Sequence, residues 1–97
     1  MGLTSRQSRH LRSLAHHLDP VVRVGTAGVT DAVVSKLDHE LTTHELVKVR
    51  LEGDRAEVRA DAAQLATATG SELAQIIGRI AVLYRRRAKK PTIRLPE

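Results

Sequence analysis

The spacing of hydrophobic residues near the start of the chain is that of an amphipathic helix. Apolar positions recur three or four residues apart, at Leu11, Leu14, Ala15 and Leu18. This period places them on one face, so we predict a helix over residues 5–17 with that face buried. Thr4 and Gln7 have the spacing of a capping box, in which each side chain binds the other's backbone N–H.

Two more segments have the same helical period. Residues 31–43 carry an apolar stripe of Val33, Val34, Leu37 and Leu41, and residues 57–69 carry one of Val58, Ala62, Leu65 and Ala66. Thr30 can cap the first of these helices, because a threonine oxygen accepts from the free N–H groups of the first turn. Gly70 suits the C-terminal end of the second.

Residues 45–51 alternate in the manner of a β-strand. One predicted face holds Val47, Val49 and Leu51, and the other holds Leu46, Lys48 and Arg50. The first face is apolar, whereas the second is apolar at one end and basic at the other. This pattern predicts a sheet that is half open to solvent, with cations on its open side.

Three shorter segments complete the predicted sheet. Residues 21–24 are mostly apolar, and residues 73–77 and 80–85 are separated only by Gly78 and Arg79. Glycine in the first position of a two-residue loop suits a type II′ hairpin turn. We therefore expect the last two strands to be antiparallel neighbours.

The order of elements, α-β-α-β-α-β-β, predicts an α/β fold. We expect a two-layer type of sandwich with one mixed four-stranded sheet and three helices. A chain of 97 residues is long enough for one modest core, so residues 1–97 are interpreted as a single domain with a basic C-terminal extension at about residues 86–97. Residues 92–95 would pack loosely or pair as an edge.

A Gly-x-x-Gly sequence, Gly25-Thr26-Ala27-Gly28, lies between a predicted strand and a predicted helix. Two glycines let the backbone turn sharply and approach another molecule closely. The N–H groups of such a loop and of the following helix start suit an anion such as a nucleic-acid phosphate. An ordinary tight turn would show the same sequence, so its place in the chain and the surrounding charge decide the interpretation.

Charge is distributed unevenly along the chain. Residues 1–28 have a net charge of +3, residues 29–72 of −4 and residues 73–97 of +6. Clustered cations and an isoelectric point near 10.4 are typical of a nucleic-acid-binding protein; the alternative is a charged surface that only aids solubility. Tyr84 is the only aromatic residue, which argues against a surface that stacks bases on rings.

Four groups of residues are candidates for contact with a nucleic acid. Arg6 and Arg9 lie in the first turns of the first predicted helix, where the helix dipole disfavours cations. Folding alone would not favour this placement, whereas binding to a polyanion would. The candidates are Gly25, Thr26, Ala27 and Gly28 in the loop; Arg6, Arg9, His10 and Arg12 in the first helix; Lys48 and Arg50 in the central strand; and Arg85, Arg86 and Arg87 in the basic run.

The sequence lacks the usual signatures of catalysis and metal binding. There is no cysteine, the histidines do not have ligand spacing such as H-E-x-x-H, and no serine lies in a G-x-S-x-G elbow. We expect no enzymatic activity, no metal site and no cofactor. Since no apolar run approaches the length of a membrane span or forms a signal peptide, we expect a cytoplasmic protein.

An ordered set of short segments resembles the CRM domain in its bacterial single-domain form, the YhbY family. The segments are Leu11-x-x-Leu14-Ala15-His16, Pro20-Val21-Val22, Gly25-x-x-Gly28-Val29-Thr30, His44-Glu45-Leu46-Val47-Lys48-Val49, Gly70, Gln75-Ile76-Ile77-Gly78-Arg79 and Val82-Leu83-Tyr84-Arg85. The resemblance implies an RNA-binding domain with a fold similar to the C-terminal domain of a translation initiation factor. It further implies association with precursors of the large ribosomal subunit and RNA contacts at the Gly25–Gly28 loop.

The resulting hypothesis is a monomeric, non-catalytic RNA-binding protein whose partner is ribosomal RNA in a large-subunit precursor. Two other interpretations remain open from the residues alone. The chain could be a protein–protein module that docks on ribosomal or other acidic partners, since it has both basic and acidic regions. It could also bind DNA, although residues 19–24 do not resemble a helix-turn-helix.

Overall fold

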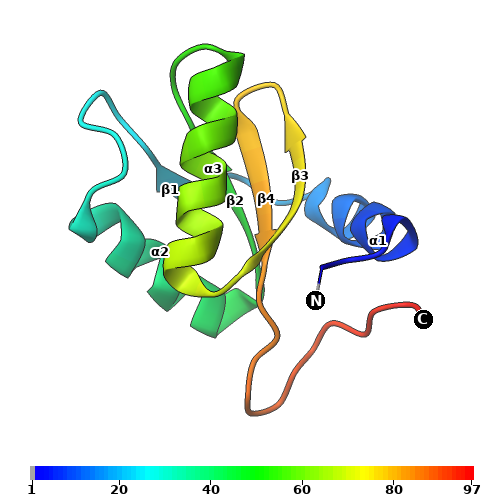
Figure 1. The fold of residues 1–97 in the computed structure, drawn as a ribbon. Coiled ribbons are helices and arrows are strands. Elements are labelled where there is room, and N and C mark those ends of the chain that lie inside the picture. The colour runs from blue at the N-terminus through cyan, green and yellow to red at the C-terminus, as the bar shows by residue number, and fades with distance from the viewer. Residues whose placement is uncertain (1) are drawn as a thin grey trace.

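The computed structural model describes residues 2–97 and contains three helices and four strands within that range (Figure 1). In chain order the elements are α1 (Ser5–Ala15), β1 (Val22–Arg23), α2 (Asp31–His44), β2 (Leu46–Arg50), α3 (Arg55–Thr69), β3 (Glu72–Ile77) and β4 (Ile80–Tyr84). This confirms the predicted order and the α/β class.

The strands form one mixed sheet in the order β1-β2-β4-β3. β1 runs parallel to β2, with Val22 opposite Val49, and β4 is antiparallel to both β2 and β3. At the β3–β4 hairpin, Gly78 has a φ of +59°, and its loop partner Arg79 is not in the positive-φ region. A positive φ at the first loop residue alone is what a type II′ turn requires.

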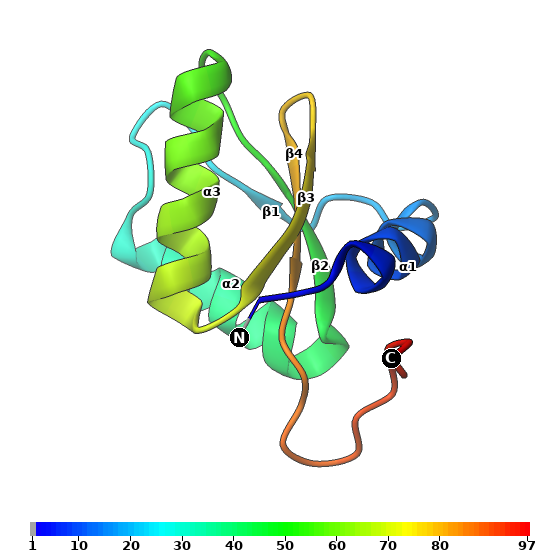
Figure 2. The same cartoon turned by 45° about the vertical axis from the view of Figure 1, so that its right-hand side comes forward.

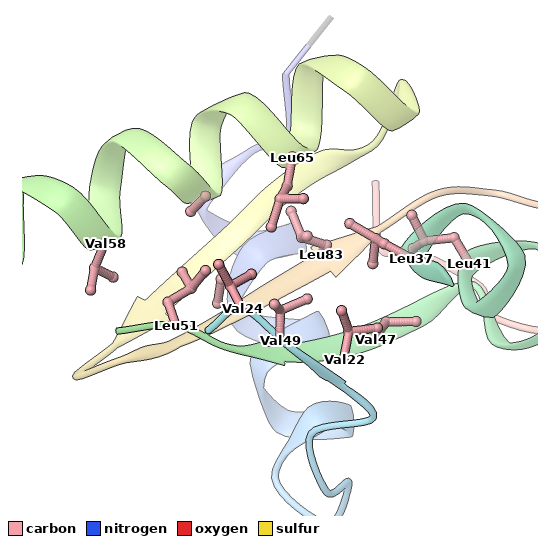
Figure 3. Close-up of a cluster of buried hydrophobic side chains, with 12 residues drawn as sticks. Val22, Val24, Leu37, Leu41, Val47, Val49, Leu51, Val58, Leu65 and Leu83 are labelled. Atoms are coloured by element: carbon pink, nitrogen blue, oxygen red, sulfur yellow. The ribbon is translucent and has the colours of Figure 1, made fainter. Parts of the chain in front are cut away.

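α2 and α3 lie together on one face of the sheet, and α1 lies on the other (Figure 2). The larger core fills the space under α2 and α3, where β1, β2 and β4 direct their valines and leucines toward Leu37, Leu41 and Leu65 (Figure 3). A smaller cluster under α1 contains Leu11, Ala15, Leu46, Val82 and Tyr84. The sheet with α2 and α3 therefore makes two complete layers, and α1 adds partial cover to the second face.

Local sequence explains where the helices begin and end. Thr4 Oγ1 accepts from the Gln7 N–H at 3.1 Å, and Gln7 Oε1 accepts from the Thr4 N–H at 3.0 Å, which confirms the predicted capping box. Asp54 and Glu57 form a second such box at the start of α3. Gly70 ends α3 with a left-handed backbone at φ +65°, a conformation that glycine adopts without steric cost.

The prediction that α1 extends to residue 17 with four buried apolar residues was wrong in part. The helix ends at Ala15, and only Leu11 and Ala15 are buried. Leu14 is 41% exposed and Leu18 is 39% exposed. The physical reason is that α1 packs on β2, β3 and β4, while β1 is only two residues long and leaves Leu14 and Leu18 beside the sheet edge.

The C-terminal segment after β4 is held against the α1 face, although it has no helix or strand within residues 85–97. Ile93 and Leu95 pack on the smaller core cluster. The carbonyl oxygen of Pro96 accepts from Gln7 Nε2 at 3.1 Å. Of the two expectations for residues 92–95, packing against the body of the protein is the one that the structure shows.

Candidate nucleic-acid interface

The Gly-x-x-Gly loop connects the end of β1 to the start of α2 and projects from the body of the molecule (Figure 1). Its backbone closes on itself, because the Gly28 N–H donates to the Gly25 carbonyl at 3.0 Å. Gly25, Thr26 and Ala27 are exposed, and a Cβ atom added at Gly25 or Gly28 would meet no other part of the protein within 4 Å. The loop therefore offers open space directly beside its main chain.

The free main-chain N–H groups of this loop suit an anion, and its backbone shape keeps them exposed. Within residues 2–97, the N–H groups of Thr26 and Ala27 have no hydrogen-bond partner. Gly28 has a φ of +76°, which only glycine adopts easily. The loop shape thus depends on Gly28, while Gly25 contributes an unobstructed approach.

The start of α2 is less free than the loop. Thr30 Oγ1 accepts from the Val33 N–H at 3.2 Å, so one N–H of the first turn is already bound. Asp31 places a carboxylate in that first turn, where it interacts favourably with the helix dipole and competes with any other anion. Phosphate contact is therefore better supported at Thr26 and Ala27 than at the helix itself.

Three cations lie side by side on β1 and β2, and we call Arg23, Lys48 and Arg50 the basic strip. Arg23 pairs with Arg50 in the parallel register. Their neighbours in both strands are buried valines of the α2–α3 core, and side chains alternate between sheet faces. The strip therefore lies on the face that α1 covers only in part; Arg23 and Arg50 are exposed and Lys48 is half-buried.

The strip continues into the glycine loop. The Val24 N–H donates to the Arg50 carbonyl at 2.8 Å, which holds the end of β1 against β2 immediately before Gly25. A phosphodiester chain can therefore pass from the cations of the strip to the free N–H groups of the loop. This arrangement combines charge with directional donors, the two features by which proteins hold nucleic-acid backbones.

The cations of α1 form a separate surface. Arg6, Arg9 and Arg12 are exposed and His10 is partly exposed. In both overall views α1 lies on the side of the molecule away from the glycine loop (Figures 1 and 2). The structure therefore does not bring the α1 candidates together with the loop, and one short RNA segment would not contact both.

Arg85, a candidate for RNA contact, is half-buried and bound to other residues of the protein. Its guanidinium donates to Asp38 Oδ1 at 2.6 Å and to the Asp38 carbonyl at 3.0 Å. It also donates to Thr42 Oγ1 and to the Thr69 carbonyl, both at 2.8 Å. These four hydrogen bonds connect α2 to the end of α3, so the side chain stabilises the packing of the two helices.

Arg86 and Arg87 also differ in whether their guanidinium groups are hydrogen-bonded within the protein. The Arg87 guanidinium donates to the carbonyls of Thr43 and Lys90, each at 2.8 Å, and so holds the basic run in a closed loop. Arg86 is exposed, and its side chain makes no hydrogen bond among the residues that the structure describes. Of the three arginines, Arg86 has its charge most fully available to a partner.

Glu45, which the sequence interpretation did not single out, anchors the C-terminal segment. The residue is fully buried, and its φ of +65° is unusual for a side-chain-bearing residue. Its carboxylate accepts from the Arg87 N–H at 2.9 Å, from the N–H and hydroxyl of Thr92, each at 2.6 Å, and from the Ile93 N–H at 3.0 Å. One carboxylate thus fixes both ends of the basic loop at residues 87–92.

This environment changes the acidity of two groups. Burial by itself raises the pKa of Glu45, but hydrogen bonds outweigh it, first the Thr92 hydroxyl and then the N–H groups of Arg87, Thr92 and Ile93. The net effect lowers the pKa from 4.5 to about 2. Burial, and then the charge of Glu45, raise the pKa of Tyr84, which lies in the smaller core cluster.

Metal-ligating side chains are not clustered in the described part of the chain. Residues 2–97 contain no group of three His, Asp or Glu side chains placed to hold a metal ion. His44 instead lies 3.4 Å from the Glu40 carboxylate, one turn away on α2. None of the helices in residues 2–97 has the length and apolar character needed to cross a membrane.

Comparison with known proteins decides the family. The model of the CRS1/YhbY (CRM) domain matches residues 3–85, which is most of the chain. The chain belongs to the CRM domain family. The C-terminal part that the family model leaves out, residues 86–97, coincides with the segment that Glu45 and the smaller core cluster hold in place.

Relatives of this CRM protein have similar lengths. It is 39% identical over 90 residues to a Pseudomonas aeruginosa protein named "Probable RNA-binding protein", covering 92% of this chain and 86% of that one. It is 39% identical over 95 residues to a Bacillus subtilis protein named likewise, covering 97% and 99%. A solution structure of a Staphylococcus aureus protein, described as a candidate RNA-binding protein, has a TM-score of 0.87 at 38% identity and covers 97% of this chain and 99% of that chain.

Sequence reasoning missed two residues of this CRM domain. Arg23 was overlooked because its strand was interpreted as mostly apolar; the single charge between Val22 and Val24 was the available signal. Glu45 gave no local signal, because its partners are 42 to 48 residues away. Glu45 forms these contacts only because the C-terminal segment folds back against the end of α2.

We expect Glu45 to make the protein sensitive to acid. In the unfolded chain the carboxyl takes up a proton near pH 4.5, whereas in the fold it stays ionised down to about pH 2. Its contribution to the free energy of unfolding, about 3 kcal/mol, is therefore complete above pH 4.5 and lost as the pH falls toward 2. Glu45→Gln should be less stable in urea at neutral pH, and this deficit should shrink toward pH 2.

The matched control is Glu52→Gln, which removes an exposed carboxylate and should leave stability nearly unchanged. The amide resonances of Arg87 and Ile93 provide a direct readout and should shift with an apparent pKa near 2. A midpoint near 4.5 for these amides would show that Glu45 does not hold the C-terminal segment.

Proposed function

We propose that this CRM protein is a monomeric, non-catalytic RNA-binding protein that holds the RNA backbone on the glycine loop and the basic strip. The observation that carries the proposal is the continuity of Arg23 and Arg50 with the exposed main chain of Gly25–Ala27. The names of the relatives, which describe RNA-binding proteins, support the choice of RNA as the anion.

The composition of the interface favours recognition of backbone and shape. The sole aromatic side chain, Tyr84, is 5% exposed and belongs to the smaller core cluster, so it offers no platform for stacked bases. Phosphate contacts fix position and orientation but carry little sequence information. Structured RNA with exposed single-stranded parts fits such a surface best.

As a finer part of the proposal, the RNA is ribosomal RNA in a precursor of the large ribosomal subunit, met in the cytoplasm. The resemblance to the single-domain YhbY proteins supports this choice. The α1 cations and Arg86 lie outside the loop and strip, so they are available to other segments of a large folded RNA. A ribosomal precursor presents such segments on several sides of a small protein.

Replacing Thr26 and Ala27 together by Asp should weaken RNA binding by about tenfold or more, because each carboxylate would repel the phosphate held by the loop. Binding to a structured ribosomal RNA fragment can be measured by fluorescence anisotropy at moderate salt. The matched control is Thr67→Asp with Ala68→Asp, which adds the same charge to exposed positions of α3. Equal affinities for the two double variants would remove the loop from the interface.

The basic strip should determine part of the salt dependence. For single-stranded RNA, log Kobs falls with log salt by about 0.7 per phosphate contacted, so Arg23→Ala with Arg50→Ala should reduce the slope by about 1.4. Arg55→Ala with Arg59→Ala, at exposed positions of α3 on the other side of the sheet, removes the same charge and should reduce the slope less. An unchanged slope in the strip variant would contradict its contact with phosphates.

The ribosomal part of the proposal has its own test. On a sucrose gradient of cell extract, the protein should sediment with large-subunit precursors, and RNase treatment should release it if RNA is the tether. Crosslinking in cells followed by sequencing of the attached RNA would identify the contact. Co-sedimentation that survives RNase would instead favour docking on ribosomal proteins.

A further inference from the structure

Most of the exposed large apolar side chains gather at one place. Within residues 2–97 there are four such side chains, and three of them, Leu14, Leu18 and Val21, line the same hollow. Leu46, Val47 and Ile93 complete its apolar lining. The hollow lies between the end of α1, the approach to β1, the start of β2 and the C-terminal segment, and measures about 480 Å³.

The hollow is continuous with the basic strip. Lys48 belongs to both, since it lines the hollow and lies two residues before Arg50 on the same face of β2. Val21 lies two residues before Arg23, and its N–H donates to the Lys48 carbonyl at 3.2 Å. One sheet face therefore presents an apolar recess, then cations and then the glycine loop.

The chemistry of the recess indicates its occupant. It combines an apolar lining with three polar side chains, Asp19, His44 and Lys48, as small-ligand sites do when a few polar groups fix orientation. A nucleobase has apolar faces and hydrogen-bonding edges, so it matches this combination. A second copy of this chain fits poorly, because it would bring its own Arg23 and Arg50 toward like charges.

We propose that the hollow between α1 and β2 binds an unstacked nucleobase of the RNA whose phosphates lie on the basic strip. This inference rests on the proposed function and deepens it, because it adds a base-binding subsite to a backbone-binding surface. The faces of the base contact Leu14, Leu18 and Val21, and the Lys48 ammonium meets an acceptor on its edge or the adjoining phosphate. Bases in loops and bulges are free to take such positions.

The test separates base contacts from phosphate contacts. Leu14→Ser with Leu18→Ser removes the apolar lining without changing charge, and the exposure of both residues makes it compatible with folding. The control is Ile77→Ser, the fourth exposed large apolar residue, on the opposite edge strand β3. The probes are an eight-nucleotide RNA of mixed sequence and an abasic ribose-phosphate chain of the same length and charge.

The wild-type protein should bind the RNA about tenfold more tightly than the abasic chain, because only the RNA has a base whose apolar faces can be buried in the hollow. Leu14→Ser with Leu18→Ser should lose this preference while its affinity for the abasic chain stays the same, and Ile77→Ser should keep it. In the saturated complex, methyl groups of Leu14, Leu18 and Val21 should show nuclear Overhauser effects to base protons.

The outcomes distinguish this inference from the proposed function. Equal affinity of the wild-type protein for both probes, or a preference that survives the double variant, overturns the base subsite while leaving backbone binding intact. An absence of Overhauser effects between these methyl groups and the bases also overturns it and leaves the hollow to a protein partner. Failure of the wild-type protein to bind either probe would count against the proposed function itself.

Discussion

The alternation of side chains along β2 is the constraint on which the proposed interface depends. Val47 and Val49 are buried in the core under α2 and α3, and Lys48 and Arg50 therefore face the other way. Because the period of a strand is two residues, a shift by one position would bury the cations and expose the valines. The core that stabilises the sheet thus also holds the cations at one register, beside Arg23 of the neighbouring strand.

Unequal cover of the two sheet faces leaves this register accessible as a surface. Two helices cover one face, whereas α1 and the C-terminal segment cover only part of the other. The uncovered part carries the basic strip and the apolar hollow, and β1 leads from it directly into the glycine loop. The apolar hollow, the cations of the basic strip and the free N–H groups of the glycine loop consequently follow one another along β1 and β2. A fully covered sheet would leave neither the basic strip nor the hollow accessible.

A single carboxylate organises the start of β2, at the other end of this strand from the glycine loop. Glu45 is buried where α2 turns into β2, and it accepts hydrogen bonds from two sites in the C-terminal segment. An unpaired buried carboxylate would be costly, and these N–H and hydroxyl donors compensate for its burial. The same contacts bring Ile93 to the hollow. The C-terminal segment therefore belongs to the fold, although no helix or strand marks it.

The sequence by itself determined the features that depend on neighbours a few residues away. Helix caps at Thr4 and Thr30, the end of α3 at Gly70 and the β3–β4 hairpin follow from local hydrogen bonds and backbone preferences. Tertiary structure alone decided which charges are available. Arg85 binds Asp38, 47 positions away, whereas Arg50 remains exposed. Composition cannot distinguish two such arginines, because a partner that distant is brought close only by the packing of the whole chain.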